Sequence, residues 1–231
     1  MKTKIIPLLL CLTLLLSFAA CSQEKHSLLY SEEHNGITYC VRGSKKLAKQ
    51  IVVKEGDEII WTKSVKIDKG VGSLNGNYGF EVLDLNFDGH LDLMIVEQVA
   101  SDCHSYRCWL KVPETNSYEL SEELSGLSNI KADPELQAIF AFSHEFEREK
   151  EYSDVASATI STDSTTKYIW NEGILTPQIK ASITFYSESN LYCYSLAYYD
   201  EEAQQFGDSD DKWLTPEEYK TYDMSFLYYF K

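Results

Sequence analysis

Oxygen-bearing side chains recur at alternate positions in one short stretch in the first half of the chain. Asp84, Asn86 and Asp88 would offer side-chain oxygens, His90 its backbone carbonyl, and Asp92 a further carboxylate. Ca²⁺ binds about six to eight oxygen ligands at roughly 2.3–2.6 Å, and a tight turn with an oxygen at every second residue supplies several of them from one segment. The spacing therefore predicts a calcium-binding loop, with calcium as the cofactor.

The residues around these ligands favour a turn between two strands. Gly89 stands at the sixth position of the loop, where a sharp turn favours a positive φ. An EF-hand is a poor match, because that motif has a bidentate Glu at its twelfth position, which here is Ile95. The flanks, 79–83 and 91–96, are short and rich in β-forming residues. The alternative is a solvated Asx-rich turn, which is common in a chain with 36 Asp and Glu residues.

The loop resembles the calcium loop of FG-GAP repeats, as in integrin α propellers. In those repeats an aromatic–glycine or glycine–phenylalanine step precedes a strand, and a D-x-[DN]-x-D-G-x-x-D loop follows. Tyr78-Gly79-Phe80 stands at the corresponding place in this chain. A repeat array would contain several such loops, whereas one is found here. No nucleophile is evident beside the loop, so calcium is expected to be structural.

The first 20 residues are typical of an export signal. Two lysines precede an apolar run over residues 5–20, which is shorter than the roughly 18 apolar residues that a membrane-spanning helix needs. The end of this run, residues 17–21, resembles a bacterial lipobox. The resemblance implies cleavage before Cys21, lipidation of Cys21 and, with Ser22 next, anchoring in the outer membrane of a Gram-negative cell. Ordinary secretion with a free Cys21 is the alternative.

Four cysteines remain in the expected exported chain: Cys40, Cys103, Cys108 and Cys193. An even number in an oxidising compartment favours disulfides, and three pairings are possible. We favour Cys103–Cys108, which would close a short turn over residues 104–107, together with Cys40–Cys193, which would tie the start of the domain to its last third. The rival interpretation is a zinc site at the C-x4-C pair, but a second pair of ligands at suitable spacing is missing.

Short β-forming runs separated by turn residues continue through the rest of the chain, with few helical periods. We expect residues 21–35 to be a lipidated tether and residues 36–231 to form a single all-β domain. Its antiparallel strands would adopt a propeller-like or sandwich-like arrangement. The turn 171–173 is expected to join two strands of a hairpin, and Thr215 is expected to cap a short helical turn that starts at Pro216.

The net charge of −15 limits the classes of partner. An acidic surface repels phosphate backbones, so nucleic acid is not an expected partner. The same surface would attract basic proteins, although acidity that serves solubility alone is an equal alternative. The sequence contains no common catalytic fingerprint, and the five histidines are scattered. We therefore expect the protein not to be an enzyme.

Several longer phrases resemble a family of exported bacterial proteins. They are residues 80–96, the W-L-x-V-P-E-T run at 109–115, the stretch 118–133, and residues 168–175. These look like a family related to periplasmic, calcium-binding immunity proteins of the lysozyme-inhibitor type with a propeller-like β fold. The likeness covers residues 75 to 190 and implies inhibition of lysozyme-like peptidoglycan hydrolases. The alternative is a cell-surface module for glycan binding or adhesion, with the same structural calcium.

Overall fold

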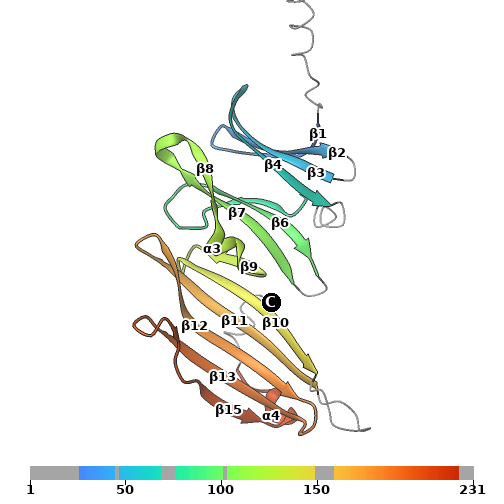
Figure 1. The fold of residues 1–231 in the computed structure, drawn as a ribbon, viewed down its shortest axis with the longest axis vertical. Coiled ribbons are helices and arrows are strands. Elements are labelled where there is room, and N and C mark those ends of the chain that lie inside the picture. Colours follow the sequence, from blue (N-terminus) through green and yellow to red (C-terminus); the bar gives the residue numbers. More distant parts are fainter. Residues whose placement is uncertain (1–25, 45–46, 69–75, 101–102, 149–158, 224–231) are drawn as a thin grey trace, which may run out of the picture.

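The computed structural model describes residues 26–44, 47–68, 76–100, 103–148 and 159–223. Within these ranges fifteen strands form three antiparallel sheets (Figure 1). The expected all-β class is therefore confirmed. The expected export signal and Cys21 lie outside the described residues. In the part of the chain that is described, no helix is long and apolar enough to cross a membrane.

The first sheet is a meander of four strands: β1 (Ser27–His34), β2 (Ile37–Ser44), β3 (Leu47–Glu55) and β4 (Glu58–Asp68). Asn35 and Gly36 join β1 to β2 with φ angles of 52° and 80°. Two positive φ angles in a two-residue loop match the twist of a hairpin, and Asn-Gly favours them. The prediction of a tether through residue 35 is therefore wrong, because residues 27–34 form an edge strand whose Leu29 and Tyr30 pack against the core.

The second sheet is another four-stranded meander: β5 (Phe80–Leu83), β6 (Asp92–Val99), β7 (His104–Val112) and β8 (Ser117–Ser121). A 3-10 turn, η1 (Pro113–Thr115), joins β7 to β8, and the short helix α3 (Glu122–Ser125) follows β8. Residues 84–91 connect β5 to β6, which pair antiparallel. The predicted loop therefore does join two strands.

The third sheet is the largest and contains β9 (Ile130–Asp133), β10 (Ala138–Arg148), β11 (Thr159–Asn171), β12 (Ile174–Tyr186), β13 (Leu191–Asp200), β14 (Gln205–Phe206) and β15 (Asp210–Leu214). Glu172 and Gly173, with φ angles of 51° and 82°, form the expected hairpin turn between β11 and β12. Helix α4 (Pro216–Tyr219) begins at the expected cap: the Thr215 hydroxyl accepts from the Glu218 backbone N–H, and the Glu218 carboxylate accepts from the Thr215 backbone N–H.

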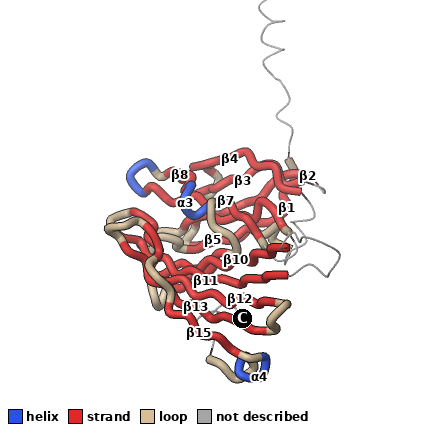
Figure 2. Tube along the Cα trace, turned by 60° about the horizontal axis from the view of Figure 1, so that its bottom comes forward, coloured by secondary structure: helices blue, strands red, loops and turns tan. Residues whose placement is uncertain are grey.

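The three sheets follow one another along the long axis of the molecule, with the second sheet between the other two (Figure 1); Figure 2 shows their edges from a tilted direction. One hydrophobic cluster joins the first sheet, the second sheet and the near end of the third. The Trp61 ring of β4 meets the Trp109 ring of β7 edge to face, with centroids 6.1 Å apart. The arrangement is sandwich-like, since the sheets bury their faces against one another.

The expected disulfides are absent from the structure, since Cys40, Cys103, Cys108 and Cys193 are all free thiols. The predicted turn over residues 104–107 is part of the extended strand β7. Cys108 is five residue steps from Cys103 along extended chain, or roughly 17 Å, whereas a disulfide needs Cα atoms within about 7 Å. Cys40 lies in β2 of the first sheet and Cys193 in β13 of the third, with the second sheet between them (Figure 1).

Candidate metal site

A close backbone contact at Gly79 positions the start of the candidate calcium loop. The backbone N–H of Val96 donates to the carbonyl of Gly79 at 3.0 Å, and Gly79 has a φ of 61°. A Cβ atom added there would lie 2.7 Å from Cγ2 of Val96. Only glycine combines this φ with this approach, which gives the Tyr78-Gly79-Phe80 step a physical role. It holds β5 against β6 just before the loop.

The loop is shaped by hydrogen bonds from its backbone to its own side chains. Oδ2 of Asp84 accepts from the N–H of Gly89 at 2.8 Å, and Oδ1 of Asp84 accepts from the N–H of Asp88 at 3.2 Å. Oδ1 of Asp88 accepts from the N–H of His90 at 2.8 Å. The side-chain amide of Asn86 donates to Oδ2 of Asp88 at 2.9 Å. Gly89 has a φ of 87°, as predicted for the sixth position.

Asp92 behaves differently from the other acidic residues of the loop because it is completely buried. Its Oδ2 accepts from the N–H of Leu85 at 2.7 Å, and its Oδ1 accepts from the N–H of Lys111 at 2.7 Å. The pKa of Asp92 is raised to about 7, mainly by burial and to a smaller extent by the charges of Asp88 and Asp84, against the lowering effect of the two hydrogen bonds. Asp92 therefore ties the loop to strand β7.

The loop supplies oxygen donors, which suit Ca²⁺ and do not suit zinc. In the described ranges, however, no group of three or more His, Cys, Asp and Glu side chains lies close enough together to hold a metal ion. Asp84, Asn86 and Asp88 share one loop, and Asp92 lies inside it with its oxygens bonded to backbone. The negative charges of Asp84 and Asp88 repel that of Asp92, and a bound cation would offset this repulsion. Calcium binding stays a prediction with a chemically suitable donor set.

A residue that the sequence did not indicate also anchors the loop. The indole Nε1 of Trp170, on β11 of the third sheet, donates to the carbonyl of Leu85 at 2.8 Å. Leu85 itself is completely buried in the core between the sheets. The partners are 85 residues apart in sequence. No local sequence pattern predicts a contact between residues so far apart in the chain.

A cavity of about 480 Å³ opens beside the loop. Its lining includes Asn86 of the loop, Trp170 and Gly173 of the third sheet, and Lys111, Glu119, Glu122 and Glu123 of the second sheet and α3. The Ser121 hydroxyl accepts from the N–H of Leu124 and so caps α3, which places Glu122 and Glu123 in the first turn. Three carboxylates therefore gather where the loop meets the third sheet.

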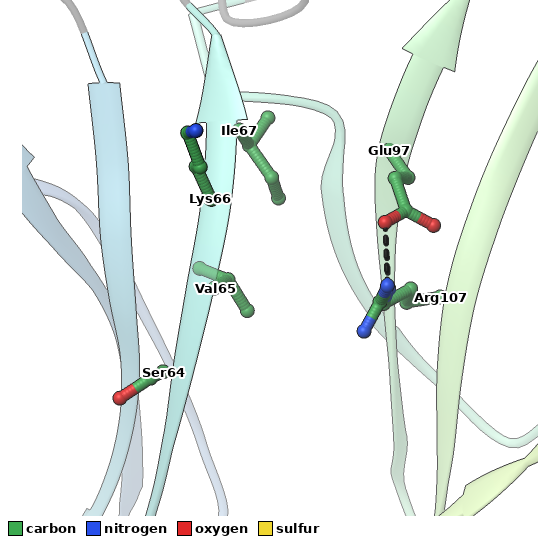
Figure 3. A pocket seen from close by; sticks show the side chains of 6 residues that line it. All are labelled: Ser64, Val65, Lys66, Ile67, Glu97 and Arg107. Carbon is green, nitrogen blue, oxygen red and sulfur yellow. Dashed lines mark hydrogen bonds and ion pairs between the residues drawn. The ribbon is translucent and has the colours of Figure 1, made fainter.

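A second cavity, of about 320 Å³, lies between β4 and the strands β6 and β7 (Figure 3). Ser64, Val65, Lys66 and Ile67 line it from β4, and Glu97 and Arg107 line it from the second sheet. Glu97 and Arg107 are paired at 2.7 Å, so the charges of the second-sheet wall are already matched. Lys66 on the β4 wall adds one positive charge to this otherwise mixed surface.

Comparisons with known proteins add little to this geometry. No protein-family model matches the chain, and no curated protein matches it either. One solved structure, described as "Structure of a Xanthomonas Type IV Secretion System related protein", is similar with a TM-score of 0.47 and 11% sequence identity. The match covers 83% of this chain and 96% of that chain. A likeness at this level carries no functional argument.

Proposed function

We propose that the chain is an exported, calcium-binding lipoprotein that inhibits a lysozyme-like peptidoglycan hydrolase. The observation that carries the proposal is the acidic cavity beside the loop, where Asn86 and Trp170 lie near Glu119, Glu122 and Glu123. Carboxylates around a hollow of about 480 Å³ suit a Lys or Arg side chain of a basic enzyme, and an indole face suits the same cation.

The net charge supports the choice of a basic partner. A chain with a net charge of −15 attracts basic proteins over a Debye length, so association is faster at low salt. Calcium would stiffen the wall of the cavity by holding Asn86 and its neighbours in place. In this proposal the protein works by occlusion and has no catalytic role. A lipid on Cys21 would hold it at the outer membrane, beside the cell wall that it protects.

Lysis of bacterial cell walls by a panel of lysozyme-type enzymes tests the proposal. The full chain is added in calcium and again in EDTA, and the fall in turbidity is followed. We expect dose-dependent inhibition that weakens in EDTA and at high salt. Asp88→Ala should remove the response to calcium.

A pair of triple variants locates the interaction. Glu119→Gln, Glu122→Gln and Glu123→Gln together remove three charges at the cavity, and we expect inhibition to weaken at least about tenfold. The matched control changes Glu188, Glu201 and Glu202 to Gln, which are exposed in turns of the third sheet and remove the same net charge. If both triple variants lose the same degree of inhibition, the net charge of the protein and not the cavity determines inhibition. No inhibition of any enzyme by the folded protein would overturn the proposal.

The second candidate, a glycan-binding or adhesion module, is favoured by one different observation. Trp213 of β15 is 54% exposed, and its ring lies 5.3 Å from the ring of Tyr186. Exposed aromatic faces of this kind stack on sugar rings. A rise in melting temperature with cell-wall oligosaccharides that is lost in Trp213→Ala, without inhibition of any hydrolase, would support this candidate over the first.

A further inference from the structure

A small pocket of about 140 Å³ lies between the β1–β2 turn and the tip of the candidate calcium loop. His34, Asn35 and Tyr39 line it from the first sheet, His90 lines it from the loop, and Lys111 and Tyr118 line it from β7 and β8. The volume is that of a few water molecules, so a functional group of two to four heavy atoms fits. The pocket differs from the cavity beside α3 that the proposed function uses, and of the residues that line the two only Lys111 is common to both.

The two phenols of this pocket are buried and poorly satisfied. Tyr39 is 2% exposed and Tyr118 is 5% exposed, and their hydroxyl oxygens are 3.5 Å apart. That distance is long for an O–H···O hydrogen bond. One shared hydrogen bond uses one hydroxyl hydrogen, so the other has no acceptor among the described residues. Burial raises the pKa of both phenols, which keeps them protonated as donors.

The ammonium of Lys111 adds further hydrogen-bond donors to the pocket. Nζ of Lys111 lies 4.6 Å from the ring centroid of Tyr118 and donates one hydrogen bond to Oδ1 of Asn116. An ammonium has three hydrogens, so donors remain for a further acceptor. Two acids lie near the pocket. Oε2 of Glu32 pairs with Nε2 of His34 at 3.2 Å, while its buried Oε1 has no partner among the described residues, and both oxygens of Asp92 accept backbone hydrogen bonds.

We propose that this pocket binds a carboxylate group, which accepts hydrogen bonds from the hydroxyls of Tyr39 and Tyr118 and pairs with the ammonium of Lys111. A carboxylate offers about four lone pairs and a full negative charge, which matches two phenols and one ammonium. Such a group of hydrogen-bond donors in one pocket is unusual for a chain with a net charge of −15. The inference does not depend on the proposed inhibition: Lys111 lines both hollows, but Tyr39 and Tyr118 line only this pocket, and Glu119, Glu122 and Glu123 line only the other cavity.

Acetate is the simplest probe of this pocket. The thermal midpoint of the full chain is followed in EDTA while sodium acetate replaces sodium chloride at constant ionic strength. We expect a saturable rise with acetate. Tyr118→Phe removes one hydroxyl and keeps the ring, and Lys111→Met removes the ammonium and keeps the chain length. Each should weaken acetate binding about tenfold.

The third sheet offers a matched control pair. Nζ of Lys212 lies 4.5 Å from the ring centroid of Tyr222, which is nearly the same arrangement without the pocket. Tyr222→Phe and Lys212→Met should leave acetate binding unchanged. Far-UV circular dichroism checks that every variant is folded, and Lys111→Met carries the test alone if Tyr118→Phe does not fold. Equal midpoints in acetate and chloride would overturn the proposal, as would equal losses from the pocket and control variants.

Two capped tripeptides distinguish the source of the carboxylate. One has a central Glu and the other a central Gln. Binding of the Glu peptide at least as tightly as acetate, with no binding of the Gln peptide, assigns the pocket to an acidic side chain of a partner protein. Binding of acetate without the Glu peptide assigns it to a small free acid. Both outcomes support a carboxylate site.

Discussion

The carboxylate of Asp92 accepts hydrogen bonds from two segments that are far apart in sequence, the loop at Leu85 and strand β7 at Lys111. The bond to Leu85 is buried with Asp92, and the bond to Lys111 is partly buried. A buried N–H without a partner costs the full desolvation of that group. The spacing of the loop predicted Asp92 as a metal ligand, and the structure adds this second role, which holds without any metal.

Replacing Asp92 by Ala should lower the free energy of unfolding by about 2–4 kcal/mol, because the buried N–H of Leu85 and the partly buried N–H of Lys111 lose their acceptor. Urea unfolding in EDTA measures this loss without a contribution from calcium. Asp133→Ala is the control, since Oδ1 of Asp133 accepts one bond, from the N–H of Leu136 in an exposed turn. The control should cost less than about 1 kcal/mol. Equal losses in the two variants would contradict the role assigned to Asp92.

Cys108 is completely buried, and burial raises the pKa of its thiol to about 12 from an ordinary value of 9.0. The fold therefore disfavours the thiolate, and the free energy of unfolding should fall as the pH rises above about 9. Alkylation with iodoacetamide at pH 8, read by mass spectrometry, should modify the partly exposed Cys103 first and Cys108 only after unfolding. Recovery of a Cys103–Cys108 disulfide from the native protein would contradict this prediction.

At the scale of single elements, turn residues were the most informative part of the sequence. Glu172-Gly173 was predicted as a hairpin turn and is one. Asn35-Gly36 is an equally strong hairpin signal, but the polar composition of the residues before it favours a tether, although they form β1. The cysteine spacing misled for a different reason: a C-x4-C pair can lie along one strand as readily as around a turn, and β7 is extended through that segment.

Gly79→Ala tests whether the glycine before β5 is needed for the loop. The variant must place a Cβ atom 2.7 Å from Val96 at a φ of 61°, so we expect a loss of about 2–3 kcal/mol in unfolding free energy and weaker calcium binding. Gly76→Ala is the matched control, because Gly76 has a φ of 76° and no heavy atom near the added Cβ. The control should lose about 1 kcal/mol. Denaturant unfolding compares the two.

At the scale of the whole molecule, the three sheets depend on contacts that no local pattern encodes. The core cluster includes Tyr39 of the first sheet, Trp109 of the second and Ile139 of the third. Short β-forming runs between turn residues predict the strands and hence the fold class. It could not predict which sheets meet, because side chains from distant segments decide that by shape and hydrogen bonding. The bond from Trp170 to the carbonyl of Leu85 is the clearest case.

Trp170→Phe should weaken the link between the third sheet and the loop. The ring keeps most of its apolar contact but loses the 2.8 Å hydrogen bond to Leu85, so we expect a loss of about 1–2 kcal/mol. For a chain of this size that loss corresponds to a few degrees in the melting temperature. The main cluster joins the first two sheets to the near end of the third, and the long strands of the third sheet connect that end to a second cluster around Ala181 and Ile183. A single calorimetric transition should therefore remain, and the stabilisation by calcium should decrease.

Trp213→Phe provides the same chemical change at a side chain that is 54% exposed, and its effect should stay within about 0.5 kcal/mol. If both variants lose the same stability, the indole of Trp170 has no special role in joining the sheets. If Trp170→Phe instead splits the melt into two transitions, the third sheet can unfold by itself. The core between the sheets would then be weaker than the buried cluster around Leu85 and Trp109 implies.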